Sequence, residues 1–226
     1  MRKIIIIGSG NIGKSINRGL QRYYDIKSNI YDIKQRTANT NILTNGFDIT
    51  GYEVILSVKK RHIEKVKKML SGKANVIYSV IPDYPQKELE QDFNSISYKR
   101  TIPNISSEFN KSYTIVYGKK DITNNIFLYL GKIKFIEKEE DYEKFIKITS
   151  STQAYIANIF KLLEEEMAKD NIQFEEYESK EFIKLILDGY ISLNSVYTNE
   201  NIINKIATPG GITENYLKHF FNKKNK

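Results

Sequence analysis

Three glycines near the amino terminus have the spacing of a phosphate-binding loop. They stand at the first, third and sixth positions of Gly8-Ser9-Gly10-Asn11-Ile12-Gly13, directly after four isoleucines. Such a β-branched run is typical of a strand buried on both faces. Gly8 would allow a tight turn, Gly10 a close approach of the backbone to a pyrophosphate, and Gly13 close packing of the next helix. The motif predicts a dinucleotide cofactor at that helix's amino terminus, with a purely structural glycine turn as the alternative.

Charged residues after the second expected strand, 29–33, bear on the choice of cofactor. An acidic residue at this strand end, here Asp32, often bonds the adenosine ribose and favours NADH. Lys34 and Arg36 follow at once, and cations there suit the 2′-phosphate of NADPH. The pattern predicts NADPH, with NADH possible, and a solvated turn is the alternative for each of the three residues.

The remaining pattern predicts an α/β protein of two domains. Strands are expected at 4–7, 29–33, 53–58 and 75–80, with an amphipathic helix over 59–70, which favours a right-handed parallel sheet. The expected sheet is completed by strands at 95–102, 113–117 and 132–136, with a short helix capped by Asp121. Strand patterns end near residue 138. The sequence therefore predicts a Rossmann-type dinucleotide-binding domain over 1–138 and an all-helical substrate and dimerisation domain over 139–226.

The expected helix over 180–197 has apolar residues nearly all round. A helical tail this short cannot cover such a surface by itself, so the pattern predicts a homodimer or a higher homo-oligomer. Leu187 and Ile191 are expected to be buried.

Composition excludes several classes of site. The chain has no cysteine and two histidines, so neither a thiolate site nor a multi-histidine metal site is expected. The net charge is +8, yet the lysines are spread along the chain without a basic, aromatic-rich helix, so we expect no nucleic-acid partner. With neither a membrane span nor a signal peptide expected, we interpret the protein as cytoplasmic.

Four stretches in this order resemble the pyrroline-5-carboxylate reductase family. They are Ile6–Gly13, Ser57-Val58-Lys59, Arg100-Thr101-Ile102-Pro103-Asn104 and Ala207-Thr208-Pro209-Gly210-Gly211-Ile212-Thr213. The last stretch is the most specific of the four. The resemblance implies transfer of a hydride from NADPH or NADH to a cyclic imine, 1-pyrroline-5-carboxylate, which yields L-proline and completes proline biosynthesis.

The resemblance also implies site residues. Those that would contact the cofactor are Gly8, Ser9, Gly10, Asn11, Ile12, Gly13, Ser57, Val58, Lys59, Ser79, Val80, Ile81 and Asn104, in addition to Asp32, Lys34 and Arg36 from the strand-end pattern. Those that would hold the substrate are Thr208, Gly210, Gly211, Ile212 and Thr213. The Thr213 hydroxyl would lie near the imine nitrogen as the catalytic group. The alternatives are a helix N-cap for Thr213, a structural ion pair for Arg100 and a solvated helix start for Lys59.

Several positions depart from the family pattern, among them Lys60 and Gln153, which replace prolines, and Ile212, which replaces a small residue. These departures leave open a reductase of a related imine or 2-hydroxyacid on the same fold. They also leave open a catalytically silent, nucleotide-binding paralogue.

Overall fold

The computed structural model describes residues 2–34, 39–121, 123–169 and 175–222 of the 226-residue chain. By compactness the chain divides into two units, Met1–Ala157 and Asn158–Lys226. The predicted boundary at residue 138 lies ahead of helix α4 (Asp141–Thr149), which packs on the sheet and so belongs to the first unit. The units divide within helix α5 (Thr152–Lys169). That the two functional roles separate at residue 138 stays a prediction.

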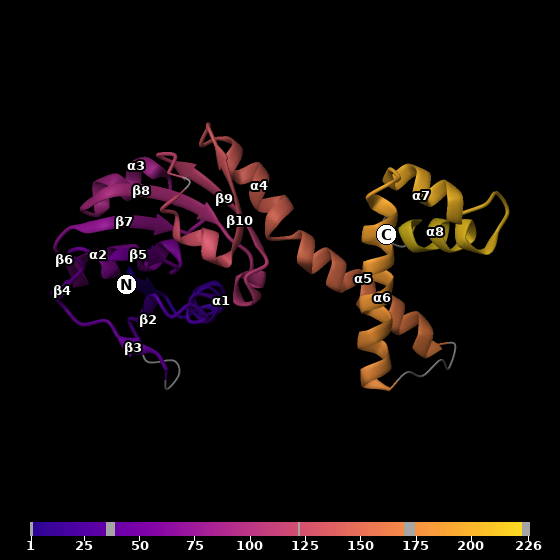
Figure 1. Cartoon of the computed structure of the whole chain (residues 1–226), viewed down its shortest axis with the longest axis horizontal. Coiled ribbons are helices and arrows are strands. Elements are labelled where there is room, and N and C mark those ends of the chain that lie inside the picture. The colour runs from indigo at the N-terminus through magenta and orange to yellow at the C-terminus, as the bar shows by residue number, and fades with distance from the viewer. Residues whose placement is uncertain (1, 35–38, 122, 170–174, 223–226) are drawn as a thin grey trace. The chain divides into compact units, whose positions relative to one another are not determined.

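Within the described residues, eight strands of the first unit form one sheet in the order β10-β9-β8-β7-β5-β1-β2-β3 (Figure 1). The strands that run parallel to one another are β1 (Arg2–Ile7), β2 (Ile26–Asp32), β3 (Asn41–Ile42), β5 (Glu53–Leu56), β7 (Ala74–Ser79) and β8 (Ser95–Ile102). At one edge, β9 (Ser112–Gly118) runs antiparallel to β8, and β10 (Gly131–Ile136) runs parallel to β9. A separate pair joins β4 (Phe47–Asp48) to β6 (Leu70–Ser71).

The predicted α/β sheet is confirmed, with its last two strands reversed. The 3₁₀ turn η2 (Ile105–Phe109) connects β8 to β9, and so short a connection cannot make the crossover that parallel neighbours require. The four isoleucines of β1 agree with its place inside the sheet, between β2 and β5. Each is at most 1% exposed, because β2 and β5 flank β1 and helices cover both faces.

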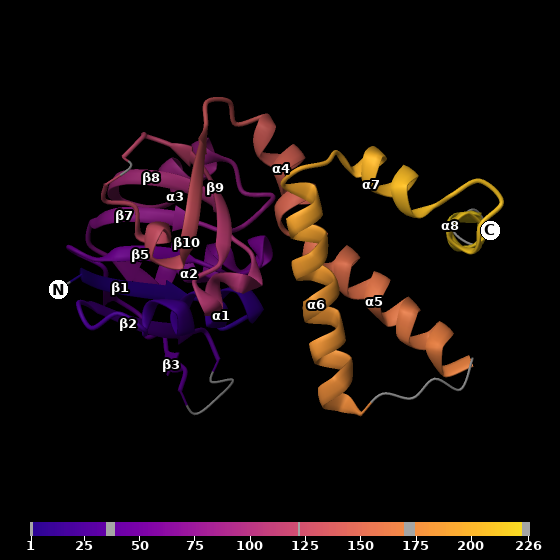
Figure 2. The same ribbon diagram turned by 45° about the vertical axis from the view of Figure 1, so that its right-hand side comes forward.

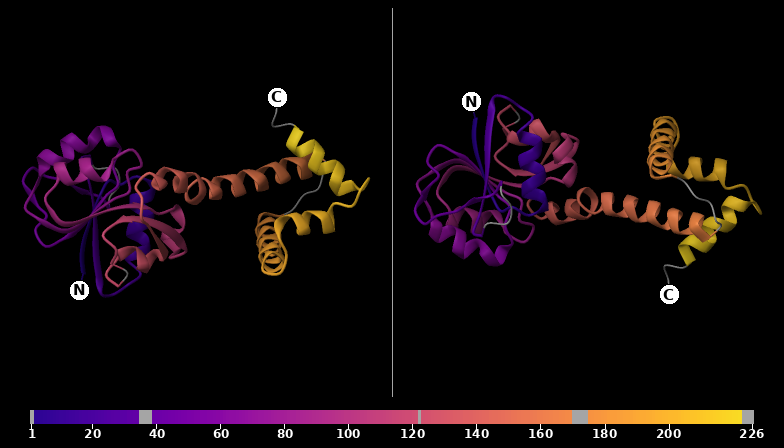
Figure 3. Two further views of the ribbon diagram at one scale, coloured as in Figure 1. Left: turned by 90° about the horizontal axis from the view of Figure 1, so that it is seen from above. Right: turned by 90° about the horizontal axis from the view of Figure 1, so that it is seen from below.

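Helices pack on both faces of the sheet (Figure 3). On one face, α1 (Asn11–Leu20) and the 3₁₀ turn η3 (Ile126–Leu130) cover Ile4 and Ile6. On the other, α2 (Ile63–Met69), preceded by the 3₁₀ turn η1 (Lys60–His62), and α3 (Gln86–Asp92) cover Ile5 and Ile7. The helix predicted over 121–130 is wrong in its first half. Asp121 accepts the N–H of Asn124 in a turn, and helical structure begins only at Ile126.

The second unit consists of helices. It contains the end of α5, then α6 (Glu176–Asn194), α7 (Asn199–Ile206) and α8 (Ile212–Asn222) (Figure 2). In the single chain α6 is not covered all round, since Leu185 is 61% exposed and Ile191 is 64% exposed, and its burial by a second subunit stays a prediction. No helix in the described part of the chain has the length and apolar character to cross a bilayer.

Candidate functional site

The glycine loop makes a sharp turn between β1 and α1. Gly8 has φ +115°, and a Cβ there would lie 2.2 Å from the carbonyl oxygen of Ser57. A Cβ on Gly13 would lie 2.0 Å from the carbonyl oxygen of Gly8. Both positions therefore accept glycine alone, for the turn and for the close packing that the sequence predicts.

Gly10 has a different environment, because a Cβ there would meet no described atom within 4 Å. Gly10 is the N-cap of α1, and no acidic residue lies in the first turn of that helix. The N–H groups of Asn11 and Ile12 have no acceptor among the described residues. An open space beside free N–H groups at the positive end of a helix dipole fits a phosphate group.

The Asp32 side chain, at the end of β2, holds the glycine loop through hydrogen bonds to Ser9. Asp32 is 3% exposed, and its Oδ2 accepts the backbone N–H of Ser9 at 2.9 Å and the Ser9 hydroxyl at 2.6 Å. Charge-assisted hydrogen bonds of this kind are about twice as strong as neutral ones. The carboxylate thus orients the loop through Ser9, in addition to the ribose contact that the sequence predicts.

A hollow of about 240 Å³ opens beside this loop. This glycine-loop hollow is lined by Gly8, Ser9, Gly10, Asp32, Ile33, Ser57, Val58, Lys59, Arg61 and His62. It brings together most of the predicted cofactor residues of β1, β2 and β5. Lys34 is exposed just beyond Asp32, and Arg36 lies outside the described residues.

Sequence reasoning missed Ile33, Arg61 and His62. It predicted an amphipathic helix over 59–70. In the structure a 3₁₀ turn precedes that helix, and Arg61 and His62 line the hollow from this turn. The run Lys59-Lys60-Arg61 was the available signal, since a cluster of cations directly after a parallel strand lies at the ligand-binding edge of the sheet.

The remaining predicted cofactor residues lie at the ends of β7 and β8. Ser79 and Ile81 are almost completely buried, and Ile81 belongs to the hydrophobic core, so any ligand contact there would come from the backbone. Val80 is half-buried. The Asn104 side chain accepts the N–H of Ser106 at 3.0 Å, which caps η2.

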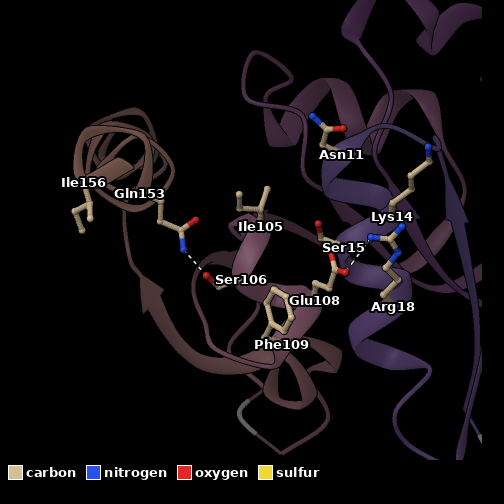
Figure 4. Close-up of a pocket in the computed structure, with 10 residues that line it drawn as sticks. All are labelled: Asn11, Lys14, Ser15, Arg18, Ile105, Ser106, Glu108, Phe109, Gln153 and Ile156. Atoms are coloured by element: carbon tan, nitrogen blue, oxygen red, sulfur yellow. Dashed lines mark hydrogen bonds and ion pairs between the residues drawn. The ribbon is translucent and has the colours of Figure 1, made fainter. Parts of the chain in front are cut away.

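A second hollow of about 760 Å³ runs along the outer face of α1 (Figure 4). This α1 groove is lined by Asn11, Lys14, Ser15, Arg18, Ile105, Ser106, Glu108, Phe109, Gln153 and Ile156. Arg18 pairs with Glu108 across it at 2.9 Å, and the Gln153 amide donates to the Ser106 hydroxyl. Gln153 thus ties the start of α5 to η2, which a proline at that position could not do.

Arg100 has the structural role that the sequence left as the alternative. The side chain is buried, and it pairs with Glu139 at 2.6 Å and donates to the carbonyl oxygen of Pro82 at 2.6 Å. Its guanidinium stacks 3.9 Å from the ring centroid of Tyr142. Glu139 also accepts the N–H of Gln86 at 2.7 Å, so its carboxylate joins the segment before α4 to β8 and to the start of α3.

The second predicted site lies on the turn before α8. Gly210 has φ +74°, and a Cβ on Gly211 would lie 2.7 Å from the Thr208 hydroxyl. The N–H of Gly210 donates to the Glu214 carboxylate at 2.9 Å, and that of Gly211 donates to the Thr208 carbonyl at 2.9 Å. The Gly210 N–H, helped by Lys218, holds the pKa of the Glu214 carboxyl below its usual value.

The first free N–H groups of α8 therefore belong to Ile212 and Thr213, which have no acceptor among the described residues. Because α8 begins at Ile212, Gly211 occupies the N-cap position and Thr213 lies within the first turn. The Thr213 hydroxyl has no hydrogen-bond partner within the described part of the chain. The N-cap alternative for Thr213 is thus not what the structure shows.

The sheet order and the loop geometry define an α/β protein of the dinucleotide-binding, Rossmann type. Comparisons with known proteins narrow the class. The sequence is 25% identical to a pyrroline-5-carboxylate reductase of Helicobacter pylori over 148 residues, which cover 63% of this chain and 57% of that protein. The chain thus matches little more than half the length of this relative. No protein-family model matches this chain.

Two solved structures resemble almost the whole chain. The pyrroline carboxylate reductase of Plasmodium falciparum, a crystal structure with NADP bound, has a TM-score of 0.78 at 18% identity and covers 99% of this chain and 90% of its own. The 1-pyrroline-5-carboxylate reductase of Streptococcus pyogenes has a TM-score of 0.77 at 20% identity, with 97% and 90% covered. The chain is therefore similar to pyrroline-5-carboxylate reductases, which confirms the resemblance that its motifs indicate.

Proposed function

We propose that this protein is an NAD(P)H-dependent oxidoreductase that reduces 1-pyrroline-5-carboxylate to L-proline. One observation carries the proposal: the space beside Gly10 is open, and the N–H groups of Asn11 and Ile12 that border it have no acceptor among the described residues. The similarity of the chain to pyrroline-5-carboxylate reductases supports this assignment. We further propose that it acts in proline biosynthesis in the cytoplasm.

The first unit would hold the cofactor, NADPH by preference and NADH with lower affinity. The amino terminus of α1 would receive the pyrophosphate, because its N–H groups face open space beside Gly10. Lys34 and Arg61 would bind a 2′-phosphate. Lys34 is an exposed cation just after the end of β2, and Arg61 is a cation that lines the glycine-loop hollow. When bound, the nicotinamide supplies the hydride, so the protein needs few reactive groups of its own.

The turn before α8 would hold the imine. The N–H groups of Ile212 and Thr213 suit a substrate carboxylate better than those of Gly210 and Gly211, which are already bonded within the turn. The Thr213 hydroxyl can both donate and accept, which suits a ring nitrogen whose protonation changes. It is a weak acid at neutral pH, so its role would be to orient the ring, with water as the proton source.

A related imine as substrate is the second candidate, and Gln153 and Ile212 favour it. Gln153 replaces a proline of the family pattern and projects into the α1 groove, where its buried Oε1 accepts no hydrogen bond from the described residues. Ile212 adds a bulky, exposed side chain, 78% exposed, at the turn that would hold the substrate. Both changes alter the surroundings of a ligand more than the cofactor loop.

We also propose a homo-oligomer assembled through the second unit. The exposed apolar side chains of α6 form a surface that water disfavours, and a second copy presents an identical surface to cover it.

The proposal is tested by following oxidation of NADPH and NADH with a small panel of cyclic imines. Reduction of pyrroline-5-carboxylate to proline, faster than reduction of unsubstituted or six-membered imines, is the expected result. Preference for another imine favours the second candidate. Tight cofactor binding without any turnover identifies a silent nucleotide-binding protein.

A further inference from the structure

Lys99 is a buried lysine in the middle of β8, and the hollow that its side chain lines opens at the amino-terminal ends of the parallel strands, away from the glycine loop. The Lys99 side chain is among the most deeply buried charged groups, with 2% of the residue exposed. Its partner in register on β9 is Gly118, which has no side chain, and on β7 it is Tyr78. The Lys99 Nζ lies 5.7 Å from the centroid of the Tyr78 ring.

The structure gives the Lys99 amine no hydrogen bond and no ion pair among the described residues. The nearby carboxylates are engaged elsewhere. Both oxygens of Glu53 accept from Arg2, at 2.7 and 2.8 Å, and Tyr78 donates to the same carboxylate at 3.3 Å. Asp121 accepts the backbone N–H of Asn124 at 3.1 Å. Because the residue Lys99 is only 2% exposed and its amine has no hydrogen bond or ion pair among the described residues, desolvation favours the neutral amine.

A hollow of about 500 Å³ gives access to this amine. The Lys99 hollow is lined by Arg2, Glu53, Asn75, Val76, Ile96, Ser97, Lys99, Lys119, Asp121 and Asn124. It opens at the amino-terminal ends of the parallel strands, where neither the cofactor nor the imine of the proposed reaction is expected. Its volume is ample for a molecule of a few non-hydrogen atoms.

The charges around the hollow act in both directions. Desolvation lowers the pKa of Lys99 most, and the Arg2 guanidinium lowers it further, whereas Asp121 and Glu53 raise it. The balance holds the pKa of Lys99 below the usual lysine value. Tyr78 cannot act as a base at neutral pH, because burial raises its own pKa. Lys119 is exposed and adds a further positive charge at the rim.

We propose that Lys99 is a nucleophilic lysine that reacts reversibly with small aldehydes entering the Lys99 hollow. The neutral amine attacks the carbonyl carbon, and the carbon–nitrogen bond forms as a proton moves from nitrogen to oxygen. The resulting carbinolamine loses one water molecule to give a Schiff base, and hydrolysis reverses the step without any oxidant or reductant. Desolvation beside a second cation, here Arg2, is a setting in which lysine acquires this reactivity.

The test is a competition between lysines of the same folded chain. The full-length protein is incubated at pH 7 with millimolar acetaldehyde and sodium cyanoborohydride, which traps each Schiff base as an N-ethyl group. Peptide mass spectrometry then gives the labelling rate at each lysine. Lys99 is expected to react severalfold faster than the half-buried Lys14 of α1, because desolvation lowers the pKa of Lys99. This advantage should shrink as the pH rises, because a larger fraction of every lysine is then neutral.

Lys99→Met, with a Lys14→Met control of similar change in charge, completes the experiment. The first variant should lose the fast-labelled site, and the second should retain it. Labelling of Lys99 no faster than that of Lys14 in the unmodified protein overturns the proposal, whether or not either variant folds. The outcome does not depend on reductase activity, so the two proposals can fail separately.

Discussion

Gly10→Ala isolates the proposed contact between the loop and the cofactor. The backbone at Gly10 has φ −70° and ψ −179°, which alanine adopts without strain, and the new methyl meets no described atom within 4 Å. Alanine is a poorer N-cap than glycine, by about 0.5–1 kcal/mol. Alanine also reduces the conformational entropy of the unfolded chain, which raises the free energy of unfolding by about 0.4–1 kcal/mol. These effects oppose each other, so the free energy of unfolding should change by less than about 1 kcal/mol.

The methyl would occupy the space that a phosphate needs. Loss of one charged hydrogen bond costs about 1.5–3 kcal/mol, which corresponds to about a 10- to 150-fold rise in the Kd of NADPH and of NADH. Titration calorimetry together with a melting curve measures both effects on one preparation. A folded Gly10→Ala protein that binds both cofactors as tightly as the wild type would refute the assignment of the loop.

Gly13→Ala is the matched control. Its methyl would lie 2.0 Å from the Gly8 carbonyl oxygen, so the helix must shift. Overpacking of this kind costs about 1–3 kcal/mol of stability. This variant should therefore lower Tm, whereas Gly10→Ala should leave Tm almost unchanged and act on the cofactor.

Four further predictions concern other parts of the chain. Replacing Lys34 and Arg61 by alanine should raise the NADPH KM more than the NADH KM in steady-state assays; equal effects would show that these cations do not bind the 2′-phosphate. Thr213→Val should lower kcat/KM by about tenfold to a thousandfold, or about 1.4–4 kcal/mol of barrier, with little change in Tm or cofactor affinity; unchanged turnover would remove Thr213 from the catalytic site. Ile191→Asp should dissociate the proposed oligomer in sedimentation, although Ile191 is 64% exposed in the single chain; a well-folded wild-type monomer at micromolar concentration would contradict the assembly. Arg100→Met should lower the free energy of unfolding by about 3 kcal/mol, because it leaves Glu139 without its partner, whereas Arg18→Met, at an exposed pair, should cost less than about 1 kcal/mol in the same denaturation assay.

The sequence predicted the elements whose patterns are local. The isoleucines of β1 and the glycine spacing predicted the strand, the turn and the following helix, because sterics alone fix these features. Reversal of β9 and β10 was not predictable in the same way, since a buried strand has the same pattern in either direction. The exposed face of α6 was predicted as buried because hydrophobicity indicates that a surface is to be covered and does not say by which chain.

Side-chain contacts between distant segments were harder to predict. Asp32 at a strand end has the same sequence pattern whether it faces a ribose or the Ser9 N–H, and the structure shows the second contact. Arg61 and His62 were missed because a single 3₁₀ turn before α2 changes the direction of both side chains. Lys99 gave no sequence signal, since a lysine in a strand is usually at a solvated position.

Deuterium transfer tests the central claim most directly. The protein is incubated with pyrroline-5-carboxylate and NADPH that carries deuterium at C4 of the dihydronicotinamide, and the product is examined by mass spectrometry and NMR. The account predicts proline with one deuterium on the former imine carbon, delivered from one face of the cofactor, and with no deuterium at that carbon when the label is in the solvent instead. Proline without deuterium from either face of the cofactor, or no proline at all, would contradict it.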